Sequence, residues 1–275
     1  MLPQAIDFRA EADELHKLLS TLSEADWARP TLFKQWTVND IVQHLHDGDL
    51  MAAASVAGPE NFAAFRAARQ ALIAGGLTRL EATRERMNGL TGRRLLDTWH
   101  ATMNGLCEKL SAMPSDTRLK WAGPDMGVRM FTTARQMETW SHGQAIYDLM
   151  GVAREPTNRL RSVAEIGVRT YGWTFANRGQ DVPGPAPHVR LTGPDGDIWT
   201  WNDPNPENIV EGGALDFCQV VTQTRNVADT DLVIEGVSAR DWMSFAQCFA
   251  GPPHDPPPPG LRRRRDEGYT VLQSS

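Results

Sequence analysis

The sequence predicts an α+β protein, with a helical bundle over residues 1–152 and a smaller α/β domain over residues 157–252. Apolar residues recur at helical spacing through most of the first half. Short runs that alternate apolar and polar residues, bounded by glycine and proline, begin after residue 181. The chain has 275 residues, which is long for a single bundle and natural for two modest domains.

The helices of the first half follow from this periodicity and from local start and stop signals. The second helix should begin after Thr37, a residue type that caps helix N termini, and Asp40 stands at the position of the reciprocal capping-box acceptor. Gly75-Gly76 should interrupt the Ala- and Arg-rich stretch. The expected helices cover about residues 3–22, 37–56, 60–88, 92–112 and 129–150.

The second half has a different character. Residues 188–192 and 197–201 alternate in polarity and flank a Gly-Pro-Asp-Gly turn sequence, which predicts a β-hairpin. Three helices and one further strand complete a small α/β domain, at about residues 158–178, 213–224, 238–249 and 230–235. Residues 253–275 are rich in proline and arginine, and we expect them to be a disordered or loosely attached tail.

Composition excludes several classes of protein. The formal net charge of −6 argues against a nucleic-acid partner, because such proteins usually present a basic face. No stretch approaches the roughly 18 consecutive apolar residues of a membrane helix, and the first residues lack the basic and apolar parts of a signal peptide. We therefore expect a cytoplasmic protein. Cys107, Cys218 and Cys248 are far apart, form no CxxC pair and are expected to be small buried hydrophobes.

One constellation of residues could bind a metal. Glu138 and His142 stand at i and i+4, so on a helix they share one face. A third ligand must come from another helix, and His44 is the best candidate because it shares a face with the apolar Ile41. His46 lies about 200° further around the same helix, so only one of the two histidines can face the bundle interior.

Two histidines and one carboxylate would leave coordination positions open, as in a catalytic zinc site. Zinc is the expected ion, although iron, nickel or manganese would accept the same ligands. Asp40 or Asp47, one turn from His44, could orient its ring. The alternative remains that Glu138 and His142 form an ordinary ion pair and that His44 is a hydrogen-bonded core residue.

Two further residues are candidates for catalysis. Arg135 precedes Glu138 by three positions and could clamp a substrate carboxylate through its planar guanidinium. Its alternative role is a salt bridge. His46 could act as an acid or base close to the metal, and its alternative position is on the outer or interhelical face of the helix.

The segments WTVNDIVQHL (36–45) and ARQMETWSHGQ (134–144) resemble the DinB-like metalloenzymes, in particular the mycothiol-dependent maleylpyruvate isomerase branch. Later segments, including GPDGDIWTW (193–201) and WMSFAQCFAGPP (242–253), extend the resemblance over most of residues 1–255. The resemblance implies a four-helix bundle that binds a metal through His44, Glu138 and His142. One departure is Ala145, where the family often has Asp, and that role would be lost or moved to Asp148.

The resemblance implies an enzyme that acts on a small organic, anionic substrate with mycothiol as thiol cofactor, as an isomerase or S-transferase. Two alternatives stay open. The first is a thiol-independent metal-dependent isomerase, cyclase or hydrolase. The second is a metal-binding protein without catalysis. The sequence favours a small-molecule partner, and leaves open whether the protein is a monomer or a homodimer.

Overall fold

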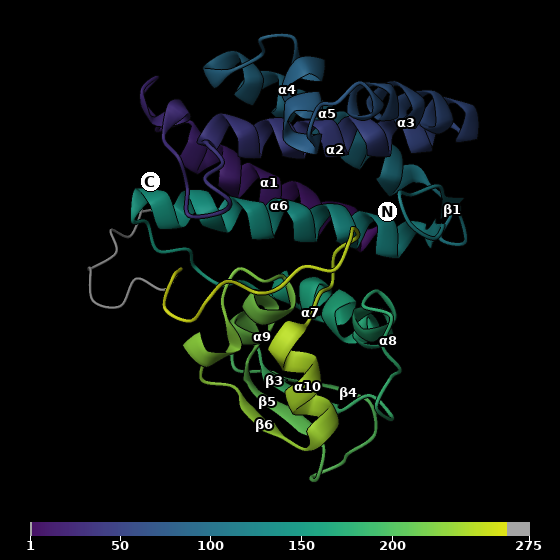
Figure 1. Ribbon diagram of the computed structural model, residues 1–275, viewed down its shortest axis with the longest axis vertical. Helices are drawn as coiled ribbons and strands as arrows, with labels where there is room; N and C mark the ends of the chain where they lie inside the picture. The colour runs from purple at the N-terminus through teal and green to yellow at the C-terminus, as the bar shows by residue number, and fades with distance from the viewer. Residues whose placement is uncertain (1, 263–275) are drawn as a thin grey trace. The chain divides into compact units, whose positions relative to one another are not determined.

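The computed structural model describes residues 2–262 and divides into two compact units, Met1–Leu149 and Met150–Ser275. The N-terminal unit is helical and the C-terminal unit contains a sheet covered by helices, so the predicted α+β class is confirmed. Figure 1 labels the elements and colours the first unit purple to teal and the second green to yellow.

Four long helices build the N-terminal unit: α1 (Pro3–Leu19), α2 (Val38–Ala57), α5 (Gly92–Ala112) and α6 (Val128–Met150). Helix α5 packs against both α1 and α2, and the shorter helices α3 (Pro59–Ala74) and α4 (Arg79–Met87) pack on α2. The stretch expected at residues 60–88 is therefore two helices, interrupted at the predicted glycine pair. Their shared core contains large apolar side chains with no exposed surface, among them Phe8, Ile41, Leu95, Trp99 and Phe131.

Helix α2 starts where the sequence predicts, because both halves of the capping box form. The Thr37 hydroxyl accepts a hydrogen bond from the Asp40 amide at 3.2 Å, and the Asp40 carboxylate accepts one from the Thr37 amide at 2.9 Å. Gly58, with a φ of 126°, ends the helix. His44 lies within the helix that Thr37 and Gly58 bound.

Helix α6 approaches α1 closely at Gly143. A Cβ atom at that position would lie 3.2 Å from a Leu15 methyl group, closer than ordinary contact. Two-residue strands β1 (Arg118–Leu119) and β2 (Met126–Gly127) form an antiparallel ribbon just before α6. Strands this short carry no periodic signal, so the sequence did not predict them.

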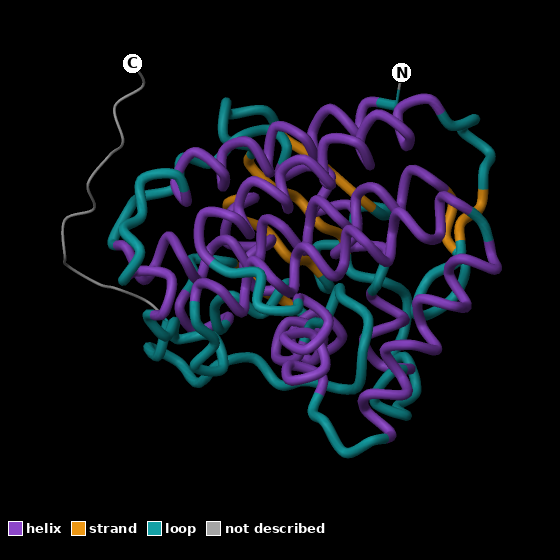
Figure 2. Tube along the Cα trace, turned by 90° about the horizontal axis from the view of Figure 1, so that it is seen from above, coloured by secondary structure: helices purple, strands orange, loops and turns teal. Residues whose placement is uncertain are grey.

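The C-terminal unit contains a four-stranded sheet in the order β4-β3-β5-β6, shown in orange in Figure 2. The predicted hairpin is confirmed: β3 (His188–Thr192) pairs antiparallel with β4 (Ile198–Trp201). Strand β5 (Ile209–Gly213) runs parallel to β3 and antiparallel to β6 (Val233–Glu235). The helices of this unit are α7 (Leu160–Arg169), α8 (Tyr171–Ala176), α9 (Ala214–Val221) and α10 (Val237–Phe245).

The first part of the expected tail makes hydrogen bonds to the C-terminal unit. Arg178 donates to the carbonyl of His254 at 2.6 Å, and the Gly260 amide donates to Asp229 at 2.9 Å. Residues 253–262 thus have a defined path over this unit. The rest of the predicted disordered tail, residues 263–275, lies outside the described residues.

Candidate metal centre

Helices α2 and α6 bring the three predicted ligands together. The Nε2 atom of His44 lies 3.4 Å from Oε2 of Glu138, and Nε2 of His142 lies 3.2 Å from the same oxygen. One ligand atom from each residue lies within 4.8 Å of the other two. A carboxylate oxygen from α6 therefore faces two imidazole nitrogens, one from each helix.

These separations fit a single metal ion. Two ligand atoms bound tetrahedrally to zinc at about 2.0–2.1 Å lie about 3.3–3.4 Å apart, close to the 3.4 and 3.2 Å observed between the nitrogens and the Glu138 oxygen. The same separations also suit hydrogen bonds from imidazole to carboxylate. The geometry therefore supports both the metal site and the ion-pair interpretation.

The protonation states of the donors suit a cation. Burial raises the pKa of the Glu138 carboxyl, but hydrogen bonds from His142 and His44 outweigh it and hold that pKa well below its ordinary value. Burial, aided by the nearby His44, lowers the pKa of His142 to about 4. At neutral pH the pair is therefore one carboxylate and one neutral imidazole, the forms in which these side chains bind metals.

Solvent reaches the centre from the side of His44. Its side chain is 33% exposed, compared with 18% for Glu138 and 14% for His142. Two aromatic side chains from the connection between α1 and α2 border the histidines. The Trp36 ring lies 5.4 Å from the His44 ring, and the Phe33 ring lies 5.0 Å from the His142 ring.

Arg135 does not lie free beside the centre, as a substrate clamp would require. Its guanidinium is buried and donates to the Asp49 carboxylate at 2.9 Å and to the Leu45 carbonyl at 3.2 Å. Gly48 lies directly beneath it, since a Cβ atom there would come within 2.8 Å of the guanidinium nitrogens. The salt bridge that the sequence left as the alternative is the role that the structure gives to Arg135.

His46 also lies away from the three ligands. It is 4% exposed, its Nδ1 atom has no hydrogen-bond partner among the described residues, and its ring interacts electrostatically with Asp49 and Asp47. Burial lowers its pKa, which favours the neutral ring. The structure thus places His46 at an interhelical position, which is the alternative given above for this residue. It gives no support to the predicted role of His46 as an acid or base.

The acidic residues expected to orient His44 have other partners. Asp40 accepts two hydrogen bonds from Arg84, at 2.7 and 2.8 Å. Asp47 accepts a hydrogen bond from Arg86 at 2.8 Å. Asp148, considered as a replacement for the missing acid at position 145, accepts from Gln144 at 3.0 Å on its own helix.

The cysteines are buried, as predicted. Burial raises the pKa of the Cys107 thiol to about 12 and that of Cys218 well above its ordinary value. Neither of these two thiols is ionised near neutral pH, so neither supplies a reactive thiolate.

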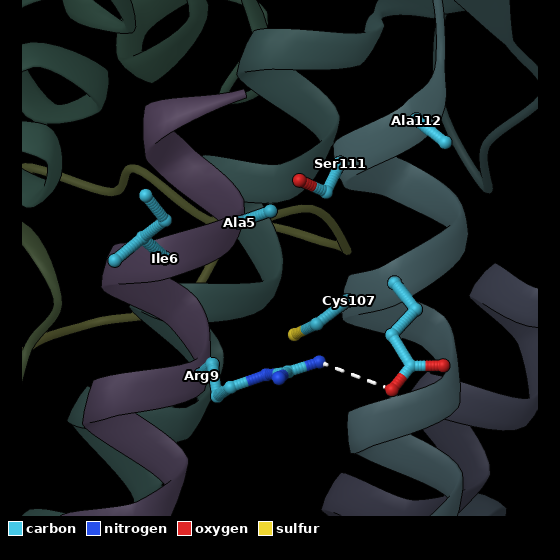
Figure 3. A pocket seen from close by; sticks show the side chains of 7 residues that line it. Ala5, Ile6, Arg9, Cys107, Ser111 and Ala112 are labelled. Carbon is cyan, nitrogen blue, oxygen red and sulfur yellow. Dashed lines mark ion pairs between the residues drawn. The ribbon is translucent and has the colours of Figure 1, made fainter. Parts of the chain in front are cut away.

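A separate hollow of about 660 Å³ lies between α1 and α5 (Figure 3). Arg9 crosses it and forms an ion pair with Glu108 at 3.7 Å. Its remaining lining residues are Ala5, Ile6, Cys107, Ser111 and Ala112. The three candidate ligands are not among them, so this hollow is distinct from the metal centre.

Among the described residues, no helix is both long enough and apolar enough to cross a membrane.

Comparison with known proteins relates most of the chain to other sequences. A family model for the mycothiol maleylpyruvate isomerase N-terminal domain matches residues 8–147, which include all three candidate ligands. Uncharacterized proteins from two strains of Mycobacterium tuberculosis are each 38% identical over 251 residues, covering 91% of this chain and 96% of theirs.

Two crystal structures also match, one of the mycothiol-dependent maleylpyruvate isomerase and one of a mutant of that enzyme. Each is 15% identical with a TM-score of 0.49, over 79% of this chain and 87% of the other. On the evidence of the family model and of the mycobacterial relatives, this chain belongs to the family of the mycothiol maleylpyruvate isomerase N-terminal domain.

Proposed function

We propose that this protein is a metal-dependent enzyme that uses mycothiol either to isomerise a small anionic organic substrate or, as an S-transferase, to join the mycothiol thiol to that substrate. One observation carries the proposal: His44, Glu138 and His142 converge from two helices with one ligand atom each within 4.8 Å of the others. These residues would hold a divalent ion, with zinc the expected one, and three protein ligands leave a position for an exogenous group.

Each ligand makes a separate contribution. Glu138 supplies the negative charge and His142 supplies a neutral imidazole, as their pKa values indicate. His44 supplies an imidazole at the solvent-facing side of the site. A bound zinc ion would lower the pKa of a thiol beside it, which makes the thiolate available as a nucleophile at neutral pH.

Charge supports the choice of an anionic substrate. A divalent ion with one carboxylate ligand leaves a net charge of about +1 at the centre, since histidine binds a metal through its neutral imidazole. An anion is therefore attracted to the open side of the site. The thiol and the reaction class are supported by the family, whose name specifies mycothiol and an isomerase.

The test combines binding with activity. Zinc-loaded wild-type protein is titrated with mycothiol by calorimetry, and maleylpyruvate isomerisation is followed by absorbance with and without mycothiol. Binding of mycothiol that requires zinc, together with turnover that requires both, supports the proposal. Turnover that requires zinc but not mycothiol would replace it by the thiol-independent alternative. Zinc binding without either ligand binding or turnover would favour a non-catalytic metal-binding protein.

A further inference from the structure

The connection between α1 and α2 contains a short hairpin, residues 29–38, whose tip lies beside the metal centre. The Thr31 amide donates to the Trp36 carbonyl at 2.8 Å, and the Val38 amide donates to the Arg29 carbonyl at 3.2 Å. Arg29 also donates to the carbonyl of Leu149, near the end of α6, at 3.4 Å. Backbone hydrogen bonds thus close the hairpin, Arg29 joins it to α6, and Figure 1 shows the purple connection between α1 and α2 passing near one end of α6.

The tip of the 29–38 hairpin is a four-residue turn in an unusual backbone conformation. The Trp36 amide donates to the Phe33 carbonyl at 2.9 Å, and the two residues between them, Lys34 and Gln35, have φ values of 51° and 58°. Two left-handed residues in a row suit a tight hairpin turn, but glycine and asparagine are the residue types that adopt it readily. Strained backbone of this kind concentrates at functional sites.

The turn places two aromatic rings against both imidazoles. The Trp36 ring lies nearly parallel to that of His142, with 5° between the planes and 6.1 Å between centroids, and it is 5.4 Å from His44. The Phe33 ring lies 5.0 Å from His142 and nearly perpendicular to Trp36. Phe33 and Trp36 therefore form a corner beside the two histidines.

The corner retains exposed surface where solvent reaches the centre. Phe33 and Trp36 are both only half-buried, and Trp36 contacts His44, which is the most exposed of the three ligands. Side chains that served core packing alone would be buried. Each of the two residues therefore keeps some exposed surface close to the most accessible ligand.

A positive charge stands at the same corner. The Lys34 ammonium lies over the Phe33 ring, 5.3 Å from its centroid, and the side chain is exposed. Phe33 thus contacts both this cation and His142. A molecule bound at the centre would meet two aromatic surfaces and one ammonium group within the same four residues.

We propose that residues 33–36 are the specificity-determining wall of the site, where Phe33 and Trp36 contact the planar carbon skeleton of the bound acid and Lys34 contacts its negative charge. This inference rests on the proposed function, because it requires the metal to be bound at His44, Glu138 and His142. A flat unsaturated or aromatic acid gains contact with the ring faces, whereas a saturated acid of equal charge gains the ammonium alone.

The test uses cobalt-substituted protein and three thiol probes, 2-mercaptobenzoate, mercaptoacetate and 2-mercaptoethanol. The sulfur-to-cobalt absorption band reports binding of each probe without any enzyme assay. Variants are Phe33→Leu, Trp36→Leu and Lys34→Gln, with Lys17→Gln on the exposed face of α1 as the matched charge control. Metal content is measured for each protein first.

If residues 33–36 determine specificity, each variant should change the affinity for the three probes in a different way. Phe33→Leu and Trp36→Leu keep their cobalt and bind mercaptobenzoate about tenfold more weakly, while mercaptoacetate changes less than about twofold. Lys34→Gln weakens both acids about three- to tenfold, more at low salt, and leaves mercaptoethanol unchanged. Lys17→Gln resembles wild type.

Two results overturn the inference in distinguishable ways. If the leucine variants lose cobalt, or bind all three probes more weakly by the same factor, then the rings only support the imidazoles. The specificity role of residues 33–36 is then rejected, whereas the metal centre is not. If wild type itself binds no cobalt, both the proposed function and the specificity role of residues 33–36 are rejected.

Discussion

Arg135 of α6 donates a hydrogen bond to Asp49 of α2 at 2.9 Å, and the side chains are 3% and 0% exposed. The same two helices carry the three candidate ligands. Trp99 donates a second hydrogen bond to Asp49, at 3.0 Å, from α5. This buried ion pair therefore ties together the helices that define the geometry of the metal centre.

We predict that Arg135→Met destabilises the protein by about 3–5 kcal/mol, because it leaves the Asp49 carboxylate buried without its cation. The double variant Arg135→Met/Asp49→Leu should recover most of this loss, since both charges are then removed. Urea denaturation followed by circular dichroism measures each change. Equal destabilisation in the single and double variants would show that lost packing, not an unpaired charge, is responsible.

Gly48 should be required beneath the Arg135 guanidinium. A Cβ atom there would lie 2.8 Å from two guanidinium nitrogens that are held in place by Asp49, so we expect Gly48→Ala to cost about 1–3 kcal/mol. Gly105→Ala on α5 is the matched control, because among residues 2–262 no atom beyond its chain neighbours and its own helix backbone lies within 4 Å of its Cβ position. That control should instead gain about 0.5–1 kcal/mol from helix propensity. Similar losses in both variants would contradict the close contact at Gly48.

The capping box of α2 should contribute stability that depends on pH. Burial raises the pKa of Asp40, but hydrogen bonds from Arg84 and Thr37 outweigh it and lower that pKa below its ordinary value. A lowered carboxyl pKa stabilises the folded state above the unfolded pKa of about 3.9, and this stability disappears as pH falls through the folded pKa.

We therefore expect Asp40→Asn to cost about 1–2 kcal/mol at pH 7 and progressively less below pH 4. Glu81→Gln in the exposed capping box of α4 is the matched control. It should cost less, because solvent surrounds its carboxylate. Thermal melts across pH 3–7 measure both. If the destabilisation by Asp40→Asn stays constant over this pH range, the pKa of Asp40 does not make the stability depend on pH.

Metal removal should lower the stability of wild type more than that of a variant that lacks one of the three ligands. With free zinc at 100 times its Kd, binding stabilises the folded state by about 2.7 kcal/mol. A chelator should therefore lower the Tm of wild type and leave that of Glu138→Gln almost unchanged. Equal responses of both proteins to chelator would mean that zinc stabilises the chain from some other site.

The sequence predicted the helices because they follow from helical periodicity. Glu138 and His142 share a face whatever the neighbouring helix is, but the choice of His44 as the third ligand depended also on the resemblance to the DinB-like metalloenzymes. Helical periodicity does not predict that Arg135 pairs with Asp49. Asp49 is distant in sequence, and its approach depends on how α2 and α6 pack.

The features that escaped prediction have weak local signals. Strand β5 follows a proline-rich segment and ends in two glycines, so it shows no alternation. The turn at residues 33–36 contains no glycine or asparagine, and only the structure shows its left-handed residues. No local pattern places Phe33 or Trp36 beside His142, because their approach depends on how the connection between α1 and α2 folds. Cytoplasmic location stays a prediction.

Zinc content is the most direct test of the central claim, measured by elemental analysis after equilibration with zinc and removal of excess. The proteins are wild type, His44→Ala, His142→Ala and His100→Ala, the last a half-buried histidine of α5 outside the ligand set. We predict about one zinc ion per chain in wild type and His100→Ala, and almost none in the other two while they remain folded. A wild type without zinc, or folded His44→Ala and His142→Ala variants that retain it, would contradict the metal centre.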